Sequence, residues 1–405
     1  MKILFLTDNF PPEVNAPATR TYEHCVEWVK AGVDVTVLTC VPNFPQGKIY
    51  PGYRNKRIQR EVMGGIKVIR VWTYMAENKG FVKRTLDYMS FMASSIFAGF
   101  SVHTDLIIAT SPQFFTAVSG YLLSIFKRKP WIMEVRDLWP DSILGVKVVK
   151  KPWMIFPLFR LEKLLYRSAD LIVPVTETFK KEICKKGIGE EKIHVVKNGS
   201  NLDLFSARPP KQALKDKLRL NGRFVVSYIG THGMAHSLEF IVMCAQSLDQ
   251  NNISFLFIGD GAKKQEIVRL VKQWDVKNVI LLDPIPKEKI PDYLSISDIA
   301  LIPLRKAEIF KSVIPSKIFE SAAMEIPILL GVDGEARSLI EKYRAGIYYE
   351  PENKNDFLQK VLKLKQDKPF YDRCKKGGRQ LASDYDRKRL AKDFLDKISE
   401  QINPG

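Results

Sequence analysis

The sequence of 405 residues has little of what marks a metal-bound, disulfide-bonded or membrane-spanning protein. Its five cysteines, Cys25, Cys40, Cys184, Cys244 and Cys374, are scattered without a CxxC pair, which argues against a zinc site and a disulfide framework. No apolar run is long enough to cross a bilayer, and the start, MKILFLTDNF, lacks the long apolar core of a signal peptide. These absences favour a cytoplasmic protein.

Negative charge is in the minority. Lysine and arginine outnumber the acidic residues by 63 to 45, and the formal net charge is +18. Such a balance implies an anionic partner: nucleic acid, an acidic membrane surface or a phosphate-rich ligand. Zinc-finger spacings and RNP-like strands are missing, and the basic residues are mixed with bulky apolar ones. We therefore expect no nucleic-acid partner, and an anionic membrane surface is the favoured one.

Short apolar or β-branched runs alternate with helical patterns along the chain. This alternation is typical of βαβ units and a parallel sheet. A first series contains KILFLTD, DVTVLTC, KVIRVWTY, LIIAT, WIMEVRD and LIVPVT, and a second begins after the Asn-Gly turn in KIHVVKNGSNLDLFSARPP. A chain of this length with 45% hydrophobic residues exceeds what one core comfortably uses. We predict an α/β protein with two doubly wound domains.

The stretch from Ile302 to Gly331 combines a strand, a basic loop, a helix and a second strand. It reads IPLRKAEIFKSVIPSKIFESAAMEIPILLG. Pro315 and Ser316 are predicted to open the helix, with the serine capping its free N–H groups. Those N–H groups and the positive end of the helix dipole would face the basic loop, so this stretch is a candidate anion site.

Lys317 falls in the first turn of that predicted helix, where a cation opposes the helix dipole. A bound phosphate would explain its position. Glu320, three residues on, projects from about the same helix face and could accept hydrogen bonds from two ribose hydroxyls. The alternative is an ordinary surface helix on which Lys317 and Glu320 pair with each other.

These residues resemble the nucleotide-sugar site of the family-four retaining glycosyltransferases. In that family a helix carries an E-x7-E motif, whose second glutamate matches Glu320 and is implied to hold the donor ribose. The first glutamate falls on Ser312, so half of the motif is absent. The variant PSK-x-FE at 315–320 is similar to a bacterial subgroup that transfers N-acetylated deoxyamino sugars such as N-acetyl-L-fucosamine. The resemblance covers nearly the whole chain.

The resemblance implies the GT-B fold, in which two Rossmann-like domains face an interdomain cleft. The acceptor-binding domain would span residues 1–198, together with a C-terminal helix at about 385–405 that crosses back onto it. The nucleotide-sugar-binding domain would span residues 199–384.

In the first half, two loops resemble donor-contacting segments of the family. Asn15 and Ala16 stand where the family has a Gly-Gly loop, and the alternative is a loop that only turns the chain. Arg136 stands at the histidine of the family's HDLWP segment, and Asp137 keeps its register. An always-charged Arg136 would bind phosphate and could not act as a base. The alternative is an ion pair of Arg136 with Glu134 or Asp137.

In the second half, Gly230, Thr231 and His232 form a Gly-flanked turn between a strand and a helix, which suits close approach by a phosphate. Family members usually carry an arginine and a lysine near this turn, and this chain lacks both. In the family, the segment that contains Pro284 and Ile285 lies beside the nucleobase.

The implied enzyme is a metal-independent, retaining hexosyltransferase that needs no cofactor besides its donor substrate, a UDP-sugar. Arg136, Asp137 and Lys317 are its candidate catalytic residues. Lys317 and Arg305 would neutralise charge that builds on the β-phosphate, in place of a metal, since no DxD-type pair is present. The implied acceptor is a polyprenyl-diphosphate-linked saccharide in the assembly of O-antigen, lipopolysaccharide or capsule.

Two other functions are compatible with the sequence. A UDP-sugar epimerase of the same fold would need a paired acid and base in its cleft, and none is evident. A nucleotide-binding protein without catalysis would satisfy the charge but leave the interdomain site unexplained.

Two segments are candidates for contact with the inner face of the bacterial cytoplasmic membrane. Residues 81–105 form a mostly apolar helix, for which we favour core packing. Residues 147–167 interleave cations with aromatic side chains in the manner of an interfacial helix. For this second segment we favour peripheral membrane contact, with core packing as the alternative.

Overall fold

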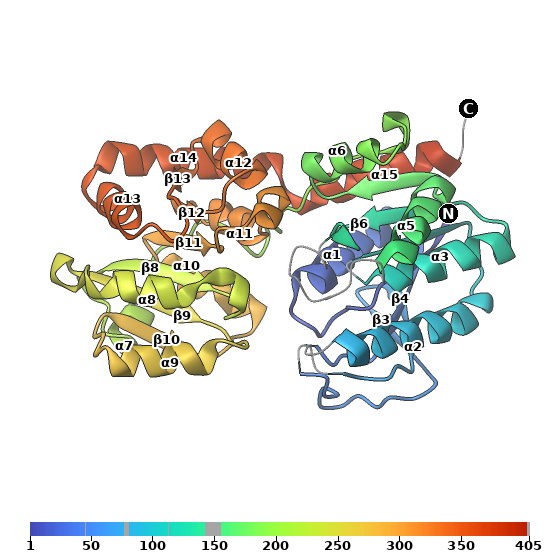
Figure 1. Cartoon of the computed structure of the whole chain (residues 1–405), viewed down its shortest axis with the longest axis horizontal. Coiled ribbons are helices and arrows are strands. Elements are labelled where there is room, and N and C mark those ends of the chain that lie inside the picture. Colours follow the sequence, from blue (N-terminus) through green and yellow to red (C-terminus); the bar gives the residue numbers. More distant parts are fainter. Residues whose placement is uncertain (45, 77–80, 112, 142–154, 403–405) are drawn as a thin grey trace. The chain divides into compact units, whose positions relative to one another are not determined.

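The computed structural model describes residues 1–44, 46–76, 81–111, 113–141 and 155–402. The chain divides into two compact units (Figure 1). The N-terminal unit comprises Met1–Lys197 and Arg387–Gly405, and the C-terminal unit comprises Asn198–Asp386. The chain therefore crosses the boundary twice, and its last helix belongs to the N-terminal unit.

The N-terminal unit is built on a seven-stranded sheet of order β3-β4-β2-β1-β5-β6-β7. Its strands are β1 Lys2–Leu6, β2 Asp34–Cys40, β3 Ile58–Met63, β4 Ile66–Val71, β5 Leu106–Thr110, β6 Trp131–Val135 and β7 Leu171–Pro174. All neighbours are parallel except β3 and β4. Sequence reasoning missed β3, because this edge strand reads IQREVM and is half exposed along its length. Gly64 and Gly65, both at positive φ, supply the tight turn of the hairpin.

Helices cover both faces of this sheet. They are α1 Ala16–Lys30, α2 Phe81–Phe100, α3 Phe114–Lys127, α5 Phe156–Ser168, α6 Glu177–Lys185 and α15 Arg387–Ile402. Side chains of α2, α3, α5 and α6 share one apolar core with the sheet residues Leu4 and Leu6. Those of α1 and α15 share a second core with Ile3 and Phe5. The alternate residues of β1 thus face opposite layers, as expected for a strand.

The last helix, α15, is held on α1 by polar and aromatic contacts. The Trp28 indole Nε1 donates to the Ala391 carbonyl over 2.8 Å. The Trp28 and Phe394 rings meet edge to face with centroids 5.3 Å apart. Both side chains are fully buried. The amphipathic pattern of this helix therefore completes the core of the N-terminal unit.

The C-terminal unit has a six-stranded, wholly parallel sheet of order β10-β9-β8-β11-β12-β13. The strands are β8 Phe224–Ile229, β9 Ile253–Ile258, β10 Val279–Leu282, β11 Ile299–Pro303, β12 Ile328–Gly331 and β13 Gly346–Tyr348. The α-helices are α7 Gln212–Lys217, α8 Leu238–Gln246, α9 Lys264–Gln273, α10 Ile290–Ser295, α11 Lys317–Ala323, α12 Glu335–Tyr343, α13 Lys354–Gln366 and α14 Lys368–Asp384. The prediction of two parallel-sheet, doubly wound α/β domains is confirmed.

The order in which the chain adds strands to each sheet reverses at one point. This point lies between β1 and β5 in the first sheet and between β8 and β11 in the second. In open parallel sheets, ligands bind at the carboxyl ends of the strands beside such a switch point. Among the described residues, none of the helices combines the length and the apolar character needed to cross a bilayer.

The contact between α15 and α1 generates a stability prediction. Phe394→Ala should destabilise the N-terminal unit by about 3–5 kcal/mol, because it leaves a cavity beside Trp28. The exposed Lys392 on the same helix is the matched control, and Lys392→Ala should change stability by less than about 0.5 kcal/mol. Calorimetric unfolding of the intact chain would show the loss, and equal transitions for the two variants would contradict this packing.

Candidate functional site

The predicted site residues lie in the loops at the carboxyl ends of parallel strands and in the first turns of the helices that follow. In the N-terminal unit these loops follow β1 and β6, and in the C-terminal unit they follow β8, β10 and β11. The two groups belong to different units and are described separately. Each occupies the edge at which a doubly wound sheet binds its ligands.

Asn15 has a structural role at the start of α1. Its side chain accepts a hydrogen bond from the Ala18 backbone N–H over 2.9 Å, so it caps the helix. Its Nδ2 donates to the Asn9 Oδ1 over 2.7 Å. The predicted glycine-like loop therefore ends at Asn15, and Ala16 is an exposed residue of the first helical turn.

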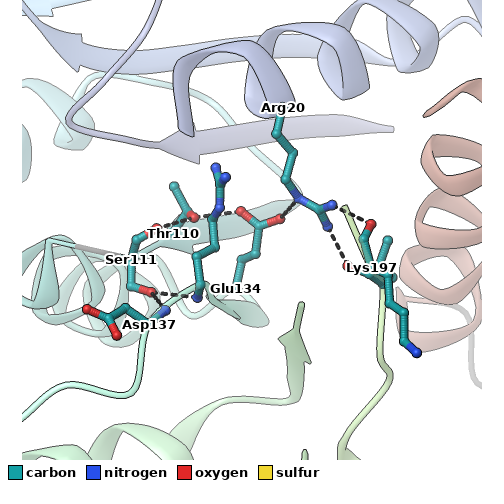
Figure 2. A network of polar contacts seen from close by, with 8 residues as sticks. Arg20, Thr110, Ser111, Glu134, Asp137 and Lys197 are labelled. Carbon is teal, nitrogen blue, oxygen red and sulfur yellow. Dashed lines mark hydrogen bonds and ion pairs between the residues drawn. The ribbon is translucent and has the colours of Figure 1, made fainter. Parts of the chain in front are cut away.

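A buried polar network joins α1 to the carboxyl ends of β5 and β6 (Figure 2). Arg20 is 1% exposed and forms an ion pair with Glu134 at 2.8 Å. Its two other nitrogens donate to the carbonyls of Lys197 and Val196 over 2.7 and 2.8 Å. The second Glu134 oxygen accepts from the Thr110 hydroxyl over 2.5 Å. Sequence reasoning missed Arg20, although an arginine among the core-facing residues of an amphipathic helix signals a buried partner.

Arg136 and Asp137 begin the loop after β6. Their backbone N–H groups both donate to the Ser111 hydroxyl, over 2.7 and 3.3 Å (Figure 2). The Arg136 Nη1 is buried and has no hydrogen-bond acceptor among the described residues. Glu134 is bonded directly to Arg20, so the alternative of a direct Arg136–Glu134 pair is not what the structure shows. Arg136 therefore keeps a donor for an oxygen ligand.

Burial and charge set the protonation of this network. Burial by itself raises the pKa of Glu134, but the Arg20 and Arg136 cations outweigh it and hold that pKa below its usual range. Burial lowers the pKa of Arg136 to about 9, while Glu134 opposes the shift. At neutral pH Arg136 is therefore a desolvated cation, and desolvation strengthens its attraction for an anion.

In the C-terminal unit, Lys317 lies against the strand-to-helix turn after β8. Its amine is 3.9 Å from the centroid of the Tyr228 ring, a cation–π contact. Gly230, at φ +143°, lies so close that a Cβ at that position would clash with the lysine amine. Burial lowers the pKa of Lys317 to about 7, and the Glu320 carboxylate opposes this shift. The pKa of Lys317 thus lies in the physiological range.

The predicted contact of His232 with the donor stays a prediction, and the structure shows the state of its side chain. The residue is fully buried, and neither ring nitrogen has a hydrogen-bond partner among the described residues. Burial, with Lys264 and Lys317 nearby, lowers its pKa to about 4, so the ring is neutral. The neighbouring Thr231 is exposed and its carbonyl accepts from the Tyr228 hydroxyl over 2.5 Å.

Arg305 donates to the Glu239 carboxylate over 2.6 Å, and its side chain is 43% exposed. Its predicted role at the β-phosphate stays a prediction. The predicted cap of the helix, by contrast, needs correction. Ser316 makes no side-chain capping bond, and α11 begins only at Lys317, after Pro315 and Ser316. With seven residues, α11 is a short helix, and Lys317 is its first residue.

The remaining predicted contacts lie nearby on the same unit. Pro284 is exposed and Ile285 half-buried in the loop after β10. Glu320 and Lys317 line a cavity of about 20 Å³ between β8, β11, α10 and α11, with Ser227 as a further polar lining residue. This volume holds about one water molecule, so a nucleotide could bind only outside it.

Both halves of the chain are similar to known protein families. Residues 15–199 match the family described as glycosyl transferase 4-like domain, and residues 211–381 match glycosyl transferases group 1. The chain is 26% identical over 353 residues to WcaI of Escherichia coli K12, which is named for colanic acid biosynthesis. The match covers 85% of this chain and 84% of that protein. It is 29% identical over 260 residues to TuaH of Bacillus subtilis 168, named for teichuronic acid biosynthesis, over 62% of each chain.

Among solved structures, HepE of Anabaena in complex with UDP-glucose superposes with a TM-score of 0.72. The match covers 99% of this chain and 100% of HepE at 16% identity. At this identity the likeness shows the fold alone. The expected GT-B class is therefore confirmed.

The Arg20–Glu134 pair generates a second prediction. Glu134→Gln removes the anion that faces Arg20 and Arg136, so it should cost about 3–5 kcal/mol of stability. The exposed Asp34–Lys67 pair at 2.8 Å is the control, and Asp34→Asn should cost no more than about 1 kcal/mol. Urea unfolding would measure both, and an equally small loss for the two variants would show that the buried pair does not hold this edge together.

Proposed function

Because this chain is a glycosyltransferase built from a glycosyl transferase 4-like domain and a glycosyl transferases group 1 domain, we propose that it moves a sugar from a UDP-sugar to a lipid-linked glycan. The single observation that carries the donor assignment is the desolvated Lys317 beside Gly230, at the switch point of the C-terminal sheet. A cation in this position suits a diphosphate. The UDP-glucose complex of HepE, a protein of the same fold, supports a UDP-sugar donor.

The proposed setting is the assembly of a surface polysaccharide such as O-antigen, lipopolysaccharide or capsule. The names of WcaI and TuaH, which refer to colanic and teichuronic acid, support it. The PSK-x-FE sequence at 315–320 supports an N-acetylated deoxyamino sugar such as N-acetyl-L-fucosamine. We place the acceptor, a polyprenyl-diphosphate-linked saccharide, at the N-terminal unit, and the protein at the inner face of the cytoplasmic membrane.

The proposed mechanism is electrostatic. As the sugar–phosphate bond breaks, negative charge grows on the departing diphosphate, and Lys317 stabilises it more strongly in a desolvated place than in water. The buried, unpartnered Nη1 of Arg136 is a second donor for phosphate or sugar oxygens. Glu320, three residues along α11 from Lys317, would hold the ribose hydroxyls outside the small cavity that both residues line. We propose a retaining reaction without a metal, because fixed cations can supply this stabilisation.

The assignment is tested with a panel of UDP-sugars and a polyprenyl-diphosphate saccharide, with release of UDP as the readout. Transfer should occur with one donor and depend on the acceptor. Lys317→Ala should slow turnover by about a hundredfold or more, on the scale of a lost preorganised donor. An interconversion of sugars without UDP release would favour an epimerase, and UDP binding without turnover would favour a non-catalytic protein.

The pKa of Lys317 generates a further prediction, on pH. Lys317 is charged below about pH 7 and loses its proton as the pH rises, so UDP affinity should weaken through this range by up to about tenfold per unit. Lys317→Arg keeps the charge at every pH and is the matched control. Calorimetric titration of both proteins from acidic to alkaline pH measures the ratio of their affinities, which removes the ionisation of UDP itself. A constant ratio would show that Lys317 does not meet the diphosphate.

A further inference from the structure

Helix α2 carries an apolar stripe that does not join the core. The exposed residues Leu86, Met89, Ala93, Phe97 and Phe100 follow one another at spacings of three and four, so they lie along one face of the helix. The core-facing residues of α2, Phe91, Ser95 and Ala98, belong to the opposite face. The sequence predicted core packing for this helix, and that holds for only one of its two apolar faces.

Helix α3 extends this surface at one end. Phe97 is 78% exposed, and Phe126 of α3 is 62% exposed beside Ile125, which is also exposed. The Phe100 and Phe126 rings meet edge to face with centroids 5.2 Å apart. We call Leu86, Met89, Phe97, Phe100, Ile125 and Phe126 the α2–α3 surface. The two helices run next to each other in the N-terminal unit (Figure 1).

The α2–α3 surface is held as a unit. The hydroxyls of Ser95 and Ser119 are 2.9 Å apart between the two helices. Lys127 at the end of α3 donates to the carbonyls of Phe100 and Val102 over 3.0 and 2.7 Å, and so satisfies the end of α2. The two helices that carry the exposed phenylalanines are therefore joined to each other. A contiguous apolar patch exposed to water is rare on a soluble protein unless it binds a partner.

The charges around these apolar residues are almost all positive. Lys83 and Arg84 are exposed at the start of α2, and Arg128 and Lys129 are exposed directly after α3. Asp87 is the single acidic residue in the two helices, and it is half-buried. Aromatic side chains between cations match a surface that offers acyl chains and anionic headgroups together.

The segment at 147–167, which the sequence favoured for membrane contact, fits this role less well in its described part. Residues 147–154 lie outside the described residues. In α5, Tyr166 is buried, and Phe159 is half-buried with the Lys186 amine 5.7 Å from its ring centroid. Phe156 and Leu164 are the large apolar side chains that α5 exposes.

We propose that the α2–α3 surface is the part of this protein that docks on an anionic lipid bilayer. The inference rests on the proposed function, in which the acceptor is lipid-linked and is reached at a membrane. The phenylalanines would enter the headgroup region, and the exposed cations Lys83, Arg128 and Lys129 would lie over anionic headgroups. The Arg84 guanidinium is held by the Tyr88 hydroxyl over 2.6 Å and is not part of this contact. Burial of the aromatic side chains and charge attraction then act together, so binding should weaken with salt without vanishing.

The test is flotation of the full chain with vesicles of phosphatidylglycerol and phosphatidylethanolamine in equal parts. The double substitution Phe97→Ser, Phe126→Ser should weaken the partition into vesicles by about tenfold or more. The matched control is Phe156→Ser, Leu164→Ser on α5, which removes two exposed apolar side chains of similar size and should leave the partition within about twofold. Reversal of Arg128 and Lys129 to glutamate should remove most of the salt-dependent part.

Two readouts separate this inference from the proposed function. UDP affinity, measured without vesicles, should be the same in the Phe97→Ser, Phe126→Ser variant and the unaltered chain. An unchanged calorimetric unfolding transition of the N-terminal unit shows that the variant is folded. Loss of vesicle binding only in the α5 variant would overturn the inference. It would instead support membrane contact by the segment at 147–167, which the sequence favoured. A shift from dimer to monomer in the Phe97→Ser, Phe126→Ser variant, with unchanged flotation, would overturn it in favour of a second copy as the occupant.

Discussion

The N-terminal site edge depends on the ion pair between Arg20 and Glu134. Burying these two charges is favourable only if each is paired and its remaining donors or acceptors are satisfied. Here the other nitrogens of Arg20 bond to the carbonyls of Val196 and Lys197, and the other oxygen of Glu134 bonds to Thr110. One guanidinium thus connects α1, the end of β6 and the residues at which the chain leaves this unit.

Arg136 owes its chemistry to this pair. Glu134 is the anion that offsets the burial of Arg136, yet its oxygens are bonded to Arg20 and Thr110. Arg136 is therefore charged and retains the buried Nη1 as a donor. Lys317 in the C-terminal unit is comparable, because its amine lies over the Tyr228 ring, and the Glu320 carboxylate only partly offsets its burial. In each unit, a desolvated cation has N–H donors that remain available for a ligand.

Several parts of the candidate site could be predicted from the sequence, and others could not. Lys317 was predicted because a cation in a first helical turn is a local signal, and Arg136 because it stands at the histidine of the family's HDLWP segment. The neutral, buried state of His232 was not foreseeable, because burial depends on how the turn after β8 packs. The same holds for the pairing of Arg305 with Glu239, which lies 66 residues away in the chain. The function of Asn15 as a helix cap was open, since cap and ligand-binding residues share the same chemistry.

By itself, the sequence determined the α/β class, two parallel sheets and the strands that bear the site loops, because the periodicities of buried strands and amphipathic helices are local properties of the chain. Only the tertiary structure decided which charges are paired. The partner of Arg20 is 114 residues away, and no local pattern encodes such a contact. It also decided which apolar faces remain exposed: α2 has apolar residues on two faces, and only packing against α3 and the sheet shows that the Phe97 face is left over.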